Sequence, residues 1–369
     1  METIKFGTQL FYSQSYDFVR KKVLAANKEN WDSIWLPDHL SGIPGAAIDD
    51  FLSLWPMFGS IAEITQGKVL GSCVTEPHRY HPAVLAQLAT TVDHITGGKF
   101  ILGIGAGEGM NLKAYKIPYD HVVTKLEESI KLMKIFWKKG KRISFKGKHY
   151  QTKKAFLLPR PTSDIPVWVA ANGPKTRKIT AEIADGWMPL GYFLDVYKEG
   201  ADEIAKIIKK EGRDLSKFTF GEFQRIYMND DEEKINEYVN GIKFGLAIQP
   251  RVLKTLGYWK EEFDQFYYEA TGFKSDEMSI LLVDREDLIK FDINKLSTIT
   301  DQIPLKKIRE NVMVGTTEEI IKKIQKYIDV GAQYFILEIQ NGASSKNRPF
   351  SYFEVSRIIS EEIIPIFNS

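Results

Sequence analysis

The sequence predicts an α/β protein, a (β/α)8 TIM barrel with insertions, from the order and the number of its apolar segments. Short apolar runs bounded by turn residues alternate with longer segments of helical periodicity, as in parallel β-α-β units. Eight such runs occur, and eight parallel strands joined by right-handed crossovers favour a closed barrel over an open sheet. Single barrels with insertions reach this length, so we expect one domain over residues 1–369.

The first four strands are expected in the first third of the chain. Their apolar runs occupy 3–10, 33–36, 69–75 and 100–104. Helical periodicity predicts helices at 18–29 and 52–63, and a further helix that begins near Pro82, a residue that suits a first helical turn. The loop 41–50 is rich in Gly, Ala and Asp. It would either move over a ligand or form a static surface loop.

The other four strands are expected after a helix at 126–137, whose apolar residues share one face. Residues 142–158 predict a small hairpin that turns at Lys146-Gly147, and 175–184 predict a helix. The strands occupy 166–171, a run that begins at Asp185, 218–227 and 333–339.

The seventh and eighth strands are separated by about a hundred residues, far more than an ordinary connection contains. We expect residues 228–310 to form a helical cap, inserted in the barrel domain and lying over its mouth. The alternative is an aromatic cluster that only packs the insert onto the barrel. Its aromatic residues are Tyr258, Trp259, Phe263, Phe266, Tyr267 and Tyr268.

The composition limits the classes of function. Apolar residues at 43 % and charged residues at 27 % are ordinary for a soluble globular protein, and no apolar run approaches the roughly 18 residues of a membrane helix. A net charge of +2 gives no nucleic-acid footprint. The single cysteine, Cys73, excludes an internal disulfide, and no histidine shows metal-ligand spacing. We expect a cytoplasmic protein without a metal, nucleic-acid or membrane partner.

Titratable residues follow two of the predicted strands. Asp38-His39 follows the second strand and Glu108 the fourth, and the carboxyl ends of parallel strands meet where chemistry collects. Imidazole can give or take a proton near neutrality, and a neighbouring carboxylate can orient it or hold a second proton. The pattern predicts either a proton-transfer site or an ordinary polar strand end.

Two glycine-containing turns are candidate ligand sites. Gly103-Ile-Gly-Ala-Gly-Glu-Gly109 resembles a dinucleotide fingerprint, but it follows the fourth strand and no apolar helix comes next. It fits backbone that passes beneath a flat ligand, or a simple turn. Asn172-Gly-Pro174 precedes a helix, whose free N–H groups would bind a phosphate. A simple capped turn is the alternative there.

Taken together, these segments resemble the bacterial luciferase-like flavin oxidoreductase superfamily. They are Pro37-Asp-His39, Gly71-Ser-Cys-Val-Thr75 with Arg79-Tyr-His-Pro82, Phe100-Ile-Leu-Gly-Ile-Gly-Ala-Gly-Glu108 with Asn111, Ala170-Ala-Asn-Gly173, and Ala184-Asp-Gly-Trp187. The resemblance covers nearly the whole chain. It looks closest to the branch that uses the deazaflavin coenzyme F420, with methylene-tetrahydromethanopterin reductase, secondary alcohol dehydrogenase, glucose-6-phosphate dehydrogenase and phthiodiolone ketoreductase-like proteins.

The resemblance implies that coenzyme F420 lies at the carboxyl-terminal mouth of the barrel and exchanges a hydride with a substrate. His39 and Glu108 match the acid–base positions of the branch. The implied coenzyme-binding residues are Asp38, Cys73, Val74, Thr75, Ala106, Gly107, Asn111, Ala171, Asn172 and Gly173. A cis peptide bond between Cys73 and Val74 and a homodimer are also implied.

Two departures from the branch bear on the substrate. Ile43 stands where the alcohol and sugar-phosphate enzymes have a tryptophan, and the run Leu190-Gly-Tyr-Phe193 replaces a lysine that grips sugar phosphate. We expect an F420-dependent oxidoreductase acting on a small-molecule carbonyl, alcohol or pterin-bound one-carbon substrate, in the manner of methylene-tetrahydromethanopterin reductase. The alternatives are an FMN-dependent monooxygenase of the same superfamily and a non-catalytic flavin-binding protein.

Overall fold

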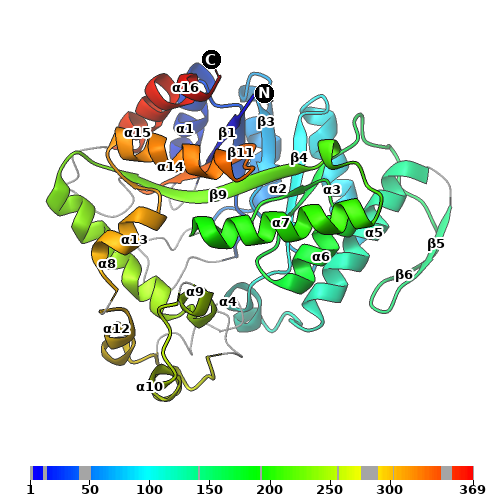
Figure 1. Cartoon of the computed structure of the whole chain (residues 1–369). Helices are drawn as coiled ribbons and strands as arrows, with labels where there is room; N and C mark the ends of the chain where they lie inside the picture. The colour runs from blue at the N-terminus through cyan, green and yellow to red at the C-terminus, as the bar shows by residue number, and fades with distance from the viewer. Residues whose placement is uncertain are drawn as a thin grey trace.

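Eight parallel strands close into a barrel in the computed structural model, which confirms the predicted fold class (Figure 1). The model describes residues 3–10, 15–40, 51–139, 142–191, 193–255, 257–275, 290–301, 303–341 and 351–368. The loop 41–50, with Ile43, lies outside these residues. Around the barrel the strands are β1 (Lys5–Gln9), β2 (Ser33–Leu36), β3 (Val69–Ser72), β4 (Phe100–Gly105), β7 (Val167–Ala170), β8 (Gly186–Trp187), β9 (Thr219–Met228) and β11 (Tyr334–Ile339).

Helices cover the outside of the barrel. They are α1 (Tyr16–Lys28), α2 (Leu54–Ile61), α3 (Pro82–Ile95), α5 (Val122–Lys139), α6 (Pro174–Ile183), α7 (Leu194–Lys210), α14 (Thr317–Asp329), α15 (Tyr352–Ile358) and α16 (Ile364–Asn368). Local sequence sets several of their ends. Pro82 occupies the first turn of α3. Thr316 and Glu319 form a capping box that starts α14. None of the helices in the described ranges is long and apolar enough to cross a bilayer.

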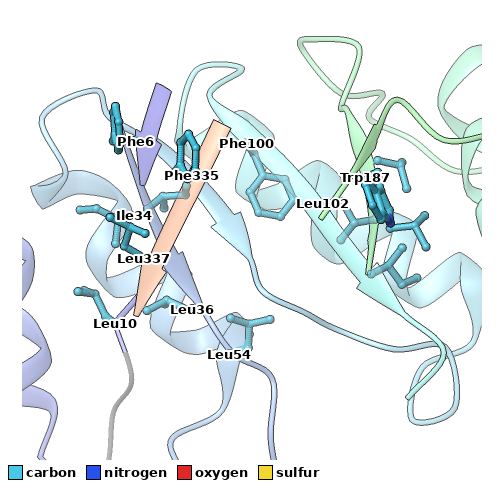
Figure 2. Packing of buried hydrophobic residues seen from close by; sticks show 14 of the residues in the cluster. Phe6, Leu10, Ile34, Leu36, Leu54, Phe100, Leu102, Trp187, Phe335 and Leu337 are labelled. Carbon is cyan, nitrogen blue, oxygen red and sulfur yellow. The ribbon is translucent and has the colours of Figure 1, made fainter. Parts of the chain in front are cut away.

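The main hydrophobic core lies between the strands and this helical layer. Figure 2 shows Phe6 of β1, Ile34 of β2 and Phe335 of β11 among its side chains. The rings of Phe6 and Phe335 stack with centroids 5.5 Å apart. Because the core is continuous around the barrel, the strand positions, and hence their carboxyl ends, are fixed relative to one another.

A second cluster fills the barrel interior below the mouth. Trp35 of β2, Trp168 of β7 and Tyr334 of β11 meet there, with ring centroids 4.9–6.1 Å apart. Glycine makes room for the two indoles. A Cβ at Gly71 would lie 2.3 Å from the Trp35 ring, and one at Gly186 would lie 2.5 Å from the Trp168 ring. Side chains therefore fill the barrel interior, and the residues of the mouth lie next to this packed layer.

The described part of the insert is helical, as the sequence predicts. It contains α8 (Glu232–Ala247), α9 (Pro250–Thr255), α10 (Glu262–Thr271), α12 (Ile293–Asp301) and α13 (Leu305–Asn311). The chain then returns through β10 (Val314–Gly315), which pairs with the carboxyl end of β9. These helices share their own apolar cluster, in which Phe263 and Tyr267 are buried, whereas Phe266 and Tyr268 are exposed. Only part of the aromatic run therefore packs the insert.

The small hairpin is also present, as β5 (Ile143–Lys146) and β6 (Gln151–Ala155). The Glu128 carboxylate of α5 accepts hydrogen bonds from the backbone N–H groups of Lys148, His149 and Tyr150 at the turn. These hydrogen bonds to the Glu128 side chain hold the turn of the hairpin against α5.

Candidate active site

A histidine, a glutamate and an asparagine from two strand ends meet at the barrel mouth. His39 follows β2, Glu108 follows β4, and Asn111 lies in the short helix α4 (Gly109–Leu112). The Asn111 amide nitrogen lies 3.0 Å from His39 Nδ1 and 2.9 Å from Glu108 Oε2. His39 Nε2 lies 3.8 Å from the same Glu108 oxygen. The structure thus brings together the two residues predicted to transfer protons.

The asparagine amide fixes the protonation pattern of the neutral imidazole. An amide NH2 group only donates, so His39 Nδ1 accepts from Asn111 and the ring proton sits on Nε2. Nε2–H therefore faces the side on which Glu108 lies. The ring also stacks on Phe51, with centroids 5.1 Å apart. The His39 side chain is 17 % exposed and that of Glu108 30 %, so neither is fully buried.

A buried ionic network supports this pair from below. Arg79 bonds the Glu76 carboxylate through Nε at 2.6 Å and lies 3.1 Å from the Asp38 carboxylate. Asp38 Oδ2 also accepts from the Thr75 hydroxyl at 2.7 Å. Burial raises the pKa of the Asp38 carboxyl, while the Arg79 charge acts in the opposite direction. The network ties the ends of β2 and β3 together immediately before His39.

Strand β3 carries a bulge at the mouth. Gly71 pairs with Ile101, yet Thr75 pairs with Ile104, so β3 contains one residue more than β4 over this stretch. Regular pairing of β3 therefore ends at Ser72 rather than at Thr75. The peptide bond between Cys73 and Val74, inside this bulge, is cis.

Two aromatic side chains, those of His78 and Tyr119, hold the turn after β4, and the sequence pattern predicts no role for either. His78 Nε2 donates to the Ala106 carbonyl at 2.9 Å, and the Tyr119 hydroxyl donates to the Gly107 carbonyl at 2.8 Å. Gly107 has a φ of 83°, which favours glycine, and a Cβ there would lie 2.9 Å from the His78 ring. Ala106, Gly107 and Glu108 are thus presented to the mouth on a fixed turn.

The end of β7 presents a helix N-terminus to the same mouth. Ala171 is buried, Asn172 is exposed, and Gly173 precedes the first residue of α6. Asn172 Oδ1 accepts from the Leu190 backbone N–H at 3.1 Å. Because β3, β4 and β7 are neighbours in the barrel, the bulge, the glycine turn and this helix start form one continuous stretch of the rim.

If this helix start binds the phosphate of a coenzyme, as the resemblance implies, replacing Gly173 by leucine is expected to weaken coenzyme binding about tenfold or more without destabilising the fold. Gly173 has a φ of −104°, and the nearest atom to an added Cβ lies 3.8 Å away, so the protein itself accommodates the side chain. The bulk would instead block the approach of an anion to the helix N–H groups. Titration of the coenzyme, with thermal unfolding as the control for folding, measures this. Unchanged affinity would place the phosphate elsewhere.

Comparison with known proteins identifies the family. The family model described as luciferase-like monooxygenase matches residues 3–334. The chain belongs to this family. Among curated relatives of this luciferase-like protein, an F420-dependent glucose-6-phosphate dehydrogenase of Nakamurella multipartita is 25 % identical over 320 residues, which cover 85 % of this chain and 84 % of the relative.

Solved structures share the fold of this luciferase-like protein. An F420-dependent secondary alcohol dehydrogenase in complex with an F420-acetone adduct is 22 % identical, covers 100 % of both chains and has a TM-score of 0.76. The FMN-bound oxygenating constituent of 3,6-diketocamphane monooxygenase from Pseudomonas putida is 18 % identical, covers 98 % of both chains and has a TM-score of 0.64. A protein named as F420-dependent and a protein in complex with FMN thus share this fold.

The luciferase-like mouth also contains polar residues that sequence reasoning missed. In the sequence, Arg79 belongs to the segment Arg79-Tyr-His-Pro82 that resembles the family, but no role was predicted for it. Gln9, Arg225 and Glu338 lie within strands that were predicted from their apolar residues, and the sequence does not show which polar residues of a strand face the mouth. In the described part of the chain, no group of three or more His, Cys, Asp or Glu side chains is arranged to hold a metal ion.

Proposed function

We propose that this luciferase-like protein is an F420-dependent oxidoreductase that transfers a hydride between the deazaflavin and a carbonyl, alcohol or pterin-bound one-carbon substrate. The observation that carries the proposal is the geometry of His39 and Glu108, whose reactive atoms lie 3.8 Å apart with Nε2–H fixed by Asn111. The names of the F420-dependent relative and structural neighbour support the choice of coenzyme.

The residues present fit a flat coenzyme with a phosphate-bearing tail. Val74, Ala170 and Leu190 are partly buried and pack on the interior cluster, so this side of the mouth offers an apolar wall. Gly105 lies between two of them, since a Cβ there would be 3.1 Å from Val74 Cγ2 and 3.7 Å from Ala170 Cβ. The wall suits a ring system, and the start of α6, farther along the same rim, suits an anion.

Coenzyme F420, when bound, supplies the hydride donor or acceptor. The protein's contribution is proton transfer at the substrate oxygen. His39 Nε2–H would donate a hydrogen bond to a carbonyl oxygen, and the Glu108 carboxyl group, when protonated, would give that oxygen its proton as the carbon receives a hydride. In the reverse direction the Glu108 carboxylate would accept the proton of an alcohol, while His39 Nε2–H would stabilise the negative charge that develops on the oxygen. The imidazole stays neutral in both directions, and Asn111 keeps both side chains in place.

An FMN-dependent monooxygenase is the second candidate, and the FMN-bound neighbour favours it. The two candidates differ in what the reduced coenzyme does, because a monooxygenase must react with oxygen, whereas reduced deazaflavin does so poorly. A non-catalytic flavin-binding protein would have no use for the ordered histidine and glutamate.

Adding F420 and FMN separately to the purified protein is expected to separate these candidates. We expect F420 to bind at least about tenfold more tightly, equivalent to about 1.4 kcal/mol. Quenching of coenzyme fluorescence measures both affinities, and oxygen uptake by the reduced complexes measures monooxygenase behaviour. Tighter binding of FMN together with rapid oxygen uptake would contradict the proposal and favour the second candidate.

A further inference from the structure

The barrel mouth has a polar wall as well as an apolar one. On the side of β9, β11 and β1, three polar residues occupy neighbouring register positions: Arg225 pairs with Glu338, and Glu338 pairs with Gln9. In a strand, alternate residues share a face. Phe223 of β9 and Ile336 of β11 belong to the interior cluster, so Arg225 and Glu338, two residues farther on, also face the interior.

A buried carboxylate anchors the arginine. Arg225 Nε lies 3.3 Å from Glu338 Oε2, and Glu338 Oε1 accepts a hydrogen bond from the Gln340 amide. The Glu338 side chain is 4 % exposed, whereas the Arg225 side chain is 38 % exposed. Both oxygens of Glu338 are engaged within the protein, and of the two side chains that of Arg225 is the more exposed.

The arginine stands across the mouth from the bulge. In the closed order of eight strands, β9 and β3 are four strands apart in either direction, so their carboxyl ends are diametrically opposite. The charges of both Glu338 and Arg225 reach the Cys73 thiol, whose pKa burial raises. Gln9 connects the two sides, because its Nε2 donates to the Cys73 carbonyl at 2.9 Å. Among the residues that the structure describes, its buried Oε1 has no hydrogen-bond partner.

We infer that Arg225 binds an oxyanion of the substrate, so that the substrate is a carbonyl or alcohol compound bearing a carboxylate or phosphate group. This inference rests on the proposed function for the orientation of the reacting groups. A coenzyme ring held on the bulge side would leave the side of β9 for the substrate. There, the substrate oxygen would meet His39 and the oxyanion would meet Arg225. Guanidinium groups suit such planar anions because they donate several hydrogen bonds in a fixed geometry.

The substrate anion is tested with pairs of ketones that share a skeleton and differ in whether they carry an anionic group. The pairs are 4-oxopentanoate with 2-pentanone, and hydroxyacetone phosphate with hydroxyacetone. Calorimetric binding to the coenzyme-free and F420-loaded protein is the first readout, and turnover of each compound is the second. We expect at least one anionic ligand to bind tenfold or more tightly than its neutral partner. Which pair shows the preference distinguishes carboxylate from phosphate.

The variant Arg225→Met/Glu338→Gln removes both charges of the ion pair, so neither partner is left buried without the other. It is expected to lose the preference for the anion and to bind the neutral ligands as the wild type does. Arg225→Lys keeps the positive charge but lacks the planar set of guanidinium donors, so it should keep part of the preference for the anionic ligand. Arg357→Met, which removes an exposed arginine of α15, is the control for net charge.

Two outcomes overturn the inference: no anion binds the wild type better than its neutral partner, or the double variant retains the preference. The proposed function fails separately. If F420 does not bind, or no compound is turned over, while anions still bind in an Arg225-dependent manner, the oxyanion site stands and the reaction is wrong. If neutral carbonyls are turned over without any anion preference, the reaction stands and the oxyanion site is wrong.

Discussion

His39→Ala is expected to lower kcat by about 10²–10⁴-fold while leaving coenzyme affinity nearly unchanged. His39 Nε2 lies 3.8 Å from Glu108 Oε2, and removal of the ring takes away the hydrogen bond proposed to polarise the substrate oxygen beside Glu108. Glu108→Gln keeps the shape of the side chain but removes its charge, and it should lower kcat through the same step. Steady-state kinetics and coenzyme titration measure the two quantities.

Asn111→Asp provides a sharper comparison within the same group. The amide nitrogen donates both to His39 Nδ1 and to Glu108 Oε2. A carboxylate at this position could not donate these bonds and would repel Glu108, so the imidazole would lose its fixed tautomer. Near-normal kcat in both His39→Ala and Glu108→Gln would remove these residues from the chemistry. A large loss of coenzyme affinity in both would give them a binding role instead.

The sequence predicted strands well where turn residues bound an apolar run. Strand β2 occupies the expected positions because the run is short and Pro37 follows it. Strand β3 ends three residues before its predicted end. Its apolar residues continue through the bulge, and hydrophobicity does not reveal the extra residue that shifts the pairing. Only the geometry of the neighbouring β4 shows where regular pairing stops.

The candidate site divides in a similar way. His39 and Glu108 could be grouped from sequence, because strand ends alone bring them to one mouth. Arg225 could not, because Glu222, Gln224 and Arg225 are three polar residues of one strand and only the closed barrel decides which faces inward. Glu222 faces outward and is fully buried, with the Gln224 amide as its hydrogen-bond donor. A polar residue in a strand therefore marks a site only after its face is known.

Arg79→Met is expected to lower the free energy of unfolding by about 3–5 kcal/mol, because it leaves two buried carboxylates without their counter-ion. The side chain of Asp38 is 2 % exposed and that of Glu76 7 %, so water cannot replace the guanidinium. Methionine preserves most of the volume, which separates the loss of charge from the creation of a cavity. Urea denaturation of the coenzyme-free protein measures the change.

The pH dependence of this loss identifies its cause. Without Arg79, the buried Asp38 carboxyl has a folded-state pKa above its unfolded value, so between these values the folded state binds more protons than the unfolded state. Stability then rises as the pH falls through the raised pKa. Burial already raises the pKa of Asp38 against the Arg79 charge, so removing that charge shifts it further in the same direction. The loss of stability in Arg79→Met should therefore be smaller at pH 5 than at pH 8.

Arg357→Met, which breaks an exposed pair, is the control and should change stability by about 0–1 kcal/mol at both pH values. An equal deficit for Arg79→Met at the two pH values would mean that lost packing, and not the unpaired carboxylates, destabilises the mouth.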